Sequence, residues 1–385
     1  MRRTARAFLL LLLAVAASGS NRSSPFREPR VIALGESRQP GALAAGDFNR
    51  DGKLDLAVGS DGANDVLVFF GDGHGGFRQG GSFPAGPSPT EIAVADFNRD
   101  GALDLAIANH RVPTVTLLLG DGNGGFQPAH GSPFSVRSRP HPHTIDSGDV
   151  NGDGFLDLVI DSWGENRLTM LAGDGKGGFA LPGVPIEAGR KPYRNLRVAD
   201  LDGNGKPDIV VPNMAERGVT ILFGDGRGNF RGRGSTERAP ISAGPSPFTV
   251  AVADINGDGK PDIVVANYSG QIVDRSGDAL TFLLGDGRGN FRPGPRIATG
   301  HAPGDVKSGD VDGDGIADAV VLNAGSRDLT VSFGGADGLS PSRTVTVPGA
   351  GRSWRLLLAD FDGNGRADAV TASPEDHTAT VFMAR

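Results

Sequence analysis

One nine-residue pattern, rich in acidic side chains, occurs seven times along this chain at a nearly constant interval. The copies are "DFNRDGKLD" at Asp47, "DFNRDGALD" at Asp96, "DVNGDGFLD" at Asp149, "DLDGNGKPD" at Asp200, "DINGDGKPD" at Asp254, "DVDGDGIAD" at Asp310 and "DFDGNGRAD" at Asp360. Successive copies start 49, 53, 51, 54, 56 and 50 residues apart. A fixed period near 50 residues indicates a repeat architecture, so the chain has to be interpreted unit by unit.

A second pattern follows most of the acidic ones, after an apolar run. It reads "GDGHGGF" at Gly71, "GDGNGGF" at Gly120, "GDGKGGF" at Gly173 and "GDGRGNF" at Gly224 and Gly285, with a degraded form, "GGADGLS", at Gly334. Asp-Gly between two apolar runs predicts a tight hairpin, because glycine accepts the positive φ that such turns need. Each unit then holds four strands. In the second unit they are "EIAVAD", "LDLAIAN", "TVTLLLG" and "GFQPAHG".

These strands predict an all-β fold, a seven-bladed β-propeller with four-stranded blades. Leu103, Leu105 and Ile107 alternate as in a half-buried strand, whereas "TVTLLLG" is apolar on both faces, as in a sheet between two others. The first strands carry small residues, which suits crowding around a central axis. The 60 glycines and 26 prolines favour many turns and short strands.

The two ends of the chain predict how the ring closes. The last unit stops after its third strand, "TATVFMAR", and lacks a fourth. The segment "FREPRVIALGESRQP" from Phe26 is similar to the fourth-strand segment "FRPGPRIATGHAP" from Phe291. We therefore expect residues 26–34 to be an N-terminal strand that completes the last blade, and residues 26–385 to form a single propeller.

Residues 1–19 are predicted to be a signal peptide, followed by a short linker at 20–25. Arginines precede the apolar run "AFLLLLLAVAA" and small residues follow it. That run is short for a membrane span, although a retained N-terminal anchor is the alternative, and no later stretch reaches about 18 apolar residues. The mature chain is expected to be secreted, into the medium, onto the cell surface or into the periplasm. Without cysteine it has no disulfides, so bound metal is the expected constraint on the fold.

Each acidic pattern fits D-x-[DN]-x-[DN]-G-x-x-D and is predicted to be a calcium loop. Positions 1, 3, 5 and 9 offer side-chain oxygens, and position 7 offers a backbone carbonyl. Calcium takes six to eight oxygen ligands, and a glycine at position 6 allows the sharp turn of such a loop. An EF-hand would add a glutamate at position 12, but Val58 stands there in the first loop. The aspartate at position 9 is therefore the expected bidentate ligand. Magnesium fits less well, because it keeps several waters.

Up to seven Ca²⁺ ions are expected, and the predicted ligands contain 22 of the 45 acidic residues. Three carboxylates packed together repel one another unless a cation neutralises them. A run of solvated turns is the alternative, but seven copies in register favour metal. The predicted ligands are Asp47, Asn49, Asp51, Asp55, Asp96, Asn98, Asp100, Asp104, Asp149, Asn151, Asp153, Asp157, Asp200, Asp202, Asn204, Asp208, Asp254, Asn256, Asp258, Asp262, Asp310, Asp312, Asp314, Asp318, Asp360, Asp362, Asn364 and Asp368.

The two motifs resemble those of the FG-GAP and VCBS repeat family, which occurs in the N-terminal propellers of integrin α-subunits and in many secreted bacterial proteins. The similarity covers nearly all of the mature chain and includes both family signatures, "DINGDGKPD" and "LLGDGRGNF". Arg50 and Arg99 at loop position 4 depart from the pattern, as does the turn at Gly334. The resemblance implies a propeller and calcium. It does not imply one ligand, because such blades support adhesion, glycan binding and, in some members, catalysis.

The resemblance also implies that the calcium loops lie on one face, while loops between strands two and three and between blades lie on the other. All four Trp and Tyr residues fall in these opposite-face loops, with most histidines and several arginines, Arg355 among them. Aromatic and arginine side chains on loops of a rigid scaffold are typical of a binding face, although they could simply cover the core. The expected ligand-binding residues are Trp163, Tyr193, Tyr268, Trp354, His110, His141, His143 and Arg194.

No GxSxG, HExxH, Walker or dinucleotide motif occurs at a credible position, and no basic patch with interleaved aromatics indicates nucleic acid. The sequence therefore favours a monomeric, non-catalytic binding or adhesion module for a glycan or an extracellular protein. One alternative is an extracellular polysaccharide lyase or hydrolase that uses the central pocket, with Glu165, Glu216, Asp376 and the histidines as candidates. Another is a structural component of the envelope or matrix.

Overall fold

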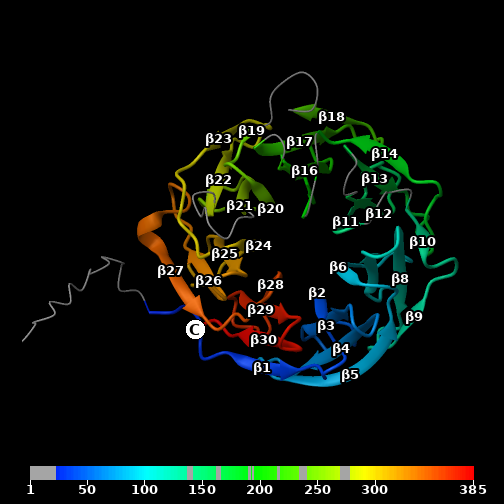
Figure 1. Ribbon diagram of the computed structural model, residues 1–385. Coiled ribbons are helices and arrows are strands. Elements are labelled where there is room, and N and C mark those ends of the chain that lie inside the picture. Colours follow the sequence, from blue (N-terminus) through cyan, green and yellow to red (C-terminus); the bar gives the residue numbers. More distant parts are fainter. Residues whose placement is uncertain are drawn as a thin grey trace, which may run out of the picture.

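The computed structural model describes residues 23–136, 142–161, 166–189, 192, 195–214, 217–233, 241–268 and 278–385. Seven antiparallel sheets stand in a ring around a central axis, so the predicted all-β, seven-bladed propeller is confirmed (Figure 1). The described residues contain one short 3-10 helix, η1 (Pro341–Arg343), and no helix with the length and apolarity to cross a membrane. The predicted signal peptide at 1–19 lies outside the described residues.

Each blade contains consecutive strands, and the first of them lies nearest the axis (Figure 1). Blade one is β2 (Pro40–Gly46), β3 (Asp55–Ser60), β4 (Asp65–Gly71) and β5 (Phe77–Pro84), and blade two is β6 (Pro89–Ala95), β7 (Asp104–Asn109), β8 (Thr114–Gly120), β9 (Phe126–Pro128) and β10 (Phe134–Ser135). Blade three is β11 (Ile145–Gly148), β12 (Asp157–Ile160), β13 (Arg167–Leu171) and β14 (Val184–Glu187). Blade four is β15 (Arg197–Ala199), β16 (Asp208–Asn213), β17 (Gly218–Gly224), β18 (Phe230–Arg233) and β19 (Ile241–Ser242).

The remaining blades follow the same order. Blade five is β20 (Pro247–Ala253), β21 (Asp262–Asn267), β22 (Ala279–Gly285) and β23 (Phe291–Pro293), and blade six is β24 (Pro303–Gly309), β25 (Asp318–Asn323), β26 (Asp328–Ser332) and β27 (Thr344–Pro348). Blade seven has β28 (Arg355–Ala359), β29 (Asp368–Ser373) and β30 (Thr378–Phe382), and its outer strand is β1 (Arg30–Ala33).

The N-terminal strand closes the ring, as the two ends of the sequence predict. β1 pairs antiparallel with β30 from Arg30 opposite Val381 to Ala33 opposite Thr378. The contact extends beyond the strand, because Phe26 forms a bridge with Ala384 and its ring packs edge-on against Phe382 at 6.0 Å. An edge that would otherwise be open is therefore paired.

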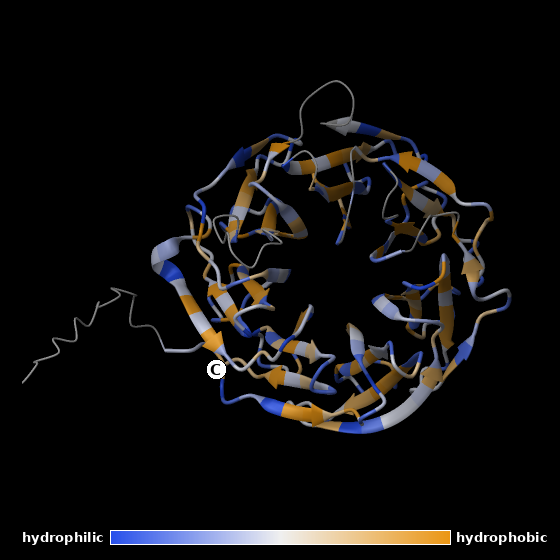
Figure 2. Cartoon of the chain, viewed as in Figure 1, coloured by the Kyte–Doolittle hydropathy of each residue, from blue (hydrophilic) through white to orange (hydrophobic). Residues whose placement is uncertain are grey.

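The core is divided among the gaps between blades. Seven clusters of buried apolar side chains each lie between two adjacent blades. The second strands are buried along their whole length, as in β3, β7 and β16, because a neighbouring blade covers each face. Figure 2 shows hydrophobic residues along the strands of every blade, with hydrophilic residues concentrated in the turns.

The glycine-rich turns are longer than the tight hairpin that Asp-Gly predicts. In blade one, Gly71 pairs with Phe77, so five residues form the loop. The Asp72 carboxylate accepts the backbone N–H groups of His74 at 2.7 Å and Gly76 at 2.9 Å, while Gly73 and Gly75 have φ near 73° and 75°. The aspartate thus organises the turn from inside, which a two-residue loop has no room for.

Candidate functional site

The acidic loops connect the first and second strands of every blade and wrap around their own first carboxylate. In blade one, Asp47 accepts the backbone N–H groups of Asp51 at 3.0 Å and Gly52 at 2.9 Å. Asp51 in turn accepts the N–H of Lys53 at 3.0 Å, and Gly52 holds a φ of 82° that few other residues adopt. These bonds fold the loop around the carboxylate of Asp47.

The aspartate at position 9 is buried and joins two parts of the blade. Asp55 accepts the N–H of Phe48, within its own loop, at 3.0 Å and the N–H of Gly71, at the end of the third strand, at 2.9 Å. The corresponding aspartates do the same in the other six blades: Asp104, Asp157, Asp208, Asp262, Asp318 and Asp368. Each carboxylate oxygen has a second lone pair, so this role is compatible with metal ligation.

Burial disfavours the ionised form of these aspartates. It raises the pKa of Asp104, Asp157, Asp208, Asp262, Asp318 and Asp368 to about 6, against the opposing effect of their backbone hydrogen bonds. Burial also raises the pKa of Asp55. A divalent cation beside such a group would favour the ionised form.

Three of the loops bring three carboxylates within 4.8 Å of one another. They are Asp200, Asp202 and Asp208 in blade four, Asp310, Asp312 and Asp314 in blade six, and Asp360, Asp362 and Asp368 in blade seven. In the last loop, Asp362 Oδ1 is buried and has no hydrogen-bond donor among the described residues. A set of hard oxygens with one such orphaned atom fits Ca²⁺. The assignment of ions to the seven loops stays a prediction.

On the opposite face, the structure brings together part of the predicted ligand-binding set. The rings of Tyr268 and Trp354 meet edge-on at 5.9 Å, and Phe248 lies 5.0 Å from Tyr268. Beside Trp354 lies a pocket of about 170 Å³ that is also lined by Asp61, Ser88 and Thr90. Trp163, Tyr193, His141 and Arg194 lie outside the described residues.

The histidines of this face form a second group. His110 Nε2 lies 3.0 Å from His143 Nε2, so one ring donates to the other. His143 is only 3% exposed, and its backbone N–H donates to Asp161 at 2.7 Å. The two histidines are therefore partners of each other.

Arg355 is not a surface residue, although the sequence placed it on the binding face. It is 6% exposed, lies 3.2 Å from Glu91 and donates to the carbonyls of Gly41 at 3.0 Å and His143 at 3.4 Å. As the first residue of β28 it points inward, and so links blade seven to blades one, two and three. In the sequence Arg355 resembles part of a loop, so this role was not predicted.

Arg355 belongs to a group that we call the axial polar layer. It consists of the inner-strand residues four places before the one that pairs with the position-9 aspartate: Ala42, Glu91, Thr144, Asn195, Thr249, Asp305 and Arg355. Asp305 accepts from Asn195 Nδ2 at 2.9 Å and from the N–H of Leu356 at 3.1 Å. Because inner strands run toward the acidic loops, this layer lies nearer the opposite face. A column-by-column alignment of the first strands would have revealed it.

Comparison with known proteins agrees with this architecture. The FG-GAP-like repeat model matches residues 47–107, 103–160, 213–265 and 310–371, which together exceed half of the chain. No curated protein matches the sequence.

Several solved structures are similar in fold. The crystal structure of BBS1N in complex with ARL6DN has a TM-score of 0.63 at 11% identity, covering 94% of this chain and 96% of that chain. A protein from Lactobacillus plantarum has a TM-score of 0.58 at 19% identity, covering 82% and 87%. The periplasmic gluconolactonase PpgL of Pseudomonas aeruginosa has a TM-score of 0.56 at 17% identity, covering 81% and 86%. At these identities the similarity concerns the fold alone, whereas the repeat match also covers the sequence motifs. The chain therefore belongs to the FG-GAP-like repeat family.

Proposed function

We propose that this chain is a secreted, calcium-binding propeller that acts as a non-catalytic binding module for a glycan, through the face opposite its acidic loops. The aromatic pair of Tyr268 and Trp354, beside a small pocket with several polar residues in its wall, is the observation that carries the proposal. Calcium has a structural role in it: the side chains at loop positions 1, 3, 5 and 9 would hold the ions and fix the turns that carry the blades.

The aromatic pair is held in place from behind. A Cβ at Gly304 would lie 2.7 Å from the indole of Trp354, so the ring rests directly on the backbone of β24. Tyr268 is supported by Phe248 and meets Trp354 edge-on at 89°. Both rings are half-buried, so part of each remains open to a ligand. A supported aromatic ring binds with little loss of side-chain freedom.

The neighbouring pocket supplies what a sugar needs besides an apolar platform. The C–H groups of a pyranose ring pack on an aromatic face, while its hydroxyl groups require hydrogen-bond partners. Asp61, Ser88 and Thr90 line the pocket next to Trp354. A mixture of aromatic walls and a few polar groups is typical of small-ligand sites.

A glycan array probed with the mature chain in millimolar calcium tests the proposal. We expect binding to a restricted set of glycans, weakened at least about tenfold by Trp354→Ala because the platform is lost. Phe155→Ala is the matched control, since Phe155 is also half-buried but lies in an acidic loop on the other face. Unchanged binding by Trp354→Ala would remove this face from consideration.

An extracellular protein is the second candidate ligand. BBS1N, whose propeller is similar in fold, was crystallised in complex with ARL6DN, so a ring of this shape takes part in a protein complex there. An array without a glycan signal, together with capture of one defined extracellular protein that Trp354→Ala abolishes, would assign the same face to a protein.

A further inference from the structure

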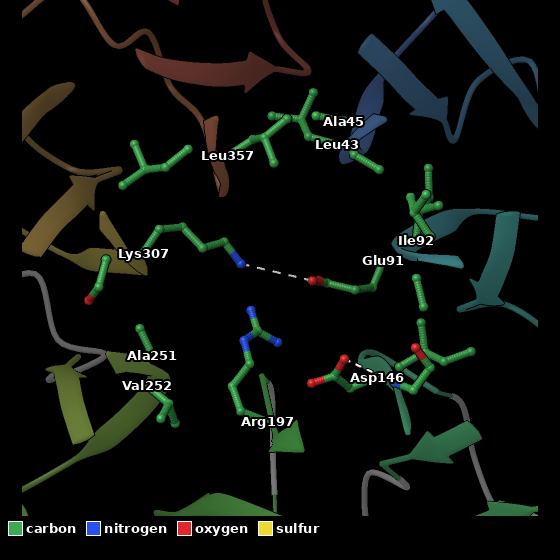
Figure 3. A pocket seen from close by; sticks show the side chains of 17 residues that line it. Leu43, Ala45, Glu91, Ile92, Asp146, Arg197, Ala251, Val252, Lys307 and Leu357 are labelled. Atoms are coloured by element: carbon green, nitrogen blue, oxygen red, sulfur yellow. Dashed lines mark hydrogen bonds and ion pairs between the residues drawn. The ribbon is translucent and has the colours of Figure 1, made fainter. Parts of the chain in front are cut away.

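A cavity of about 360 Å³ lies on the axis, on the acidic-loop side of the axial polar layer. Its charged residues come from four different first strands: Glu91, Asp146, Arg197 and Lys307 (Figure 3). Asp146, Arg197 and Lys307 occupy equivalent positions, two places before the residue that pairs with the position-9 aspartate. Leucine, isoleucine, valine and alanine side chains line most of the remaining wall. This cavity is not in contact with the Tyr268–Trp354 pair.

The acidic groups around this cavity already have hydrogen-bond donors. Asp146 accepts the backbone N–H groups of Ser147 and Val198, each at 2.9 Å. Asp305, which lies 3.8 Å from Lys307, accepts from three donors, including Asn195. Glu91 lies 3.2 Å from Arg355 Nη1. These carboxylates thus have partners other than the cavity cations, although Arg197 also attracts Asp146 and Lys307 lies within 4.0 Å of Glu91 and Asp305.

The two cations that face the cavity use few of their N–H donors in hydrogen bonds among the described residues. Lys307 Nζ lies 4.0 Å from Glu91 and 3.8 Å from Asp305, which is too far for a hydrogen bond. The guanidinium of Arg197 makes one hydrogen bond among the described residues, to the carbonyl of the adjacent Leu196 at 2.8 Å. Burial lowers the pKa of Lys307, and the positive charge of Arg197 lowers it further. Although Lys307 has carboxylates within 4.0 Å, its ammonium and most N–H groups of Arg197 have no acceptor at hydrogen-bond distance within the part of the chain that the structure describes, so the two cations have donors to offer a ligand.

We propose that the axial cavity binds a small hydroxylated carboxylate, with its carboxylate between Arg197 and Lys307. The guanidinium presents two parallel N–H donors that match a carboxylate, and the ammonium adds a point charge. Figure 3 shows Glu91 facing Lys307, to which a dashed line joins it, and Asp146 beside Arg197; lone pairs that these carboxylates keep can accept from ligand hydroxyls. The apolar walls between them suit the carbon skeleton.

Calorimetric titration of the calcium-loaded chain with D-glucuronate tests this site, with D-glucose and inorganic phosphate as the comparison ligands. Glucuronate is expected to bind, and Lys307→Met and Arg197→Gln are each expected to weaken it about ten- to a hundredfold, the value of a charge-assisted hydrogen bond. Arg231→Gln is the matched control, because Arg231 is exposed on an outer strand. Ala251→Leu narrows the cavity without changing any charge and should also abolish glucuronate binding. This variant tests the site independently if the charge variants do not fold.

Each other result contradicts the proposal. Glucose binding as tightly as glucuronate would remove the charge requirement, and phosphate binding as tightly would remove the carboxylate requirement. Wild-type affinity in Lys307→Met and Arg197→Gln, or no glucuronate binding at all, would exclude the site. Trp354→Ala should leave glucuronate affinity unchanged, so failure here is separate from failure of the glycan proposal.

Discussion

The carboxylate of Asp318 shows what the ninth loop position does in a blade. It is fully buried, and it accepts the N–H groups of Val311 and Gly334, each at 2.8 Å. The second bond persists even though the glycine-rich turn after Gly334 has diverged and contains η1 instead. The residue therefore ties the acidic loop to the end of the third strand irrespective of the turn that follows.

Replacing this aspartate should destabilise the chain with or without metal. Asp318→Ala leaves two buried N–H groups without acceptors, so we expect the free energy of unfolding to fall by about 2–4 kcal/mol in chelator. Asp314→Ala, at the exposed fifth position of the same loop, should cost less than about 1 kcal/mol there and more in calcium. Urea titrations under both conditions measure this. Equal losses for the two variants in chelator would show that the ninth position acts only through metal.

The same aspartates predict a pH dependence in the metal-free chain. Their pKa rises from 3.8 to about 6 on folding, because burial disfavours the charge. Between these two values the folded state binds more protons than the unfolded state. The stabilisation of the folded state by these aspartates is therefore complete below pH 3.8 and is lost as pH rises through about 6. We expect the Tm in chelator to fall across this window. Saturating calcium should suppress the fall, because it favours the ionised form.

Thermal unfolding at a series of pH values, with chelator and with calcium, tests the sign. Asp72, Asp225 and Asp286 in the glycine-rich turns work in the opposite direction, because hydrogen bonds lower the pKa of each. Their contribution to the stability of the folded state is lost only as pH falls below the ordinary pKa of 3.8. It therefore does not overlap with the pH range in which the buried aspartates titrate. A metal-free Tm that rises between about pH 4 and 6 would contradict the role of burial.

At the scale of strands, the first strand of each blade differs most from its counterparts. The axial polar layer holds Glu91, Asn195, Asp305 and Arg355 in four different blades, and their contacts cross the axis. The side chain of Arg355 contacts three other blades. The first strands therefore connect the blades through hydrogen bonds and an ion pair, in addition to apolar packing.

The pair of Glu91 and Arg355 should be strongly coupled. Removing one partner leaves a buried charge, so Arg355→Met and Glu91→Gln should each lower the free energy of unfolding by about 3–5 kcal/mol. The double variant leaves no unpaired charge and should cost clearly less than the sum. A double-mutant cycle in urea, with calcium present, measures the coupling. Additive losses would show that the two residues stabilise the ring independently.

The sequence could predict the features that repeat from blade to blade, but not the residues that differ between the first strands. Strands two and three, the acidic loops and the closing strand repeat in every unit or match a partner elsewhere, so seven copies reinforce one another. The polar layer does not repeat, because each blade contributes a different side chain to one shared network. No role was therefore predicted for Glu91 in "EIAVAD", and Arg355 resembled part of a loop. Whether the acidic loops hold calcium stays a prediction.

For the whole molecule, the principal prediction concerns metal removal. If seven loops bind calcium only when folded, stability should rise with free calcium by mass action. Extracellular loops of this kind bind at roughly 10⁻⁴–10⁻³ M, so dialysis against chelator should empty them and lower the Tm. Adding calcium back should restore it, whereas magnesium should restore less. A Tm that is insensitive to chelator would refute calcium as the constraint that replaces disulfides.

The pairing of β1 with β30 also brings the start of the described chain next to Arg385. The N–H of Arg385 donates to the carbonyl of Pro25 at 3.0 Å, so these two residues lie side by side. A short peptide from Arg385 to Pro25 would therefore join them, and the chain could be reopened between two blades as a circular permutant with the same ring. A domain fused after Arg385 would project from the rim, leaving both faces of the disc accessible.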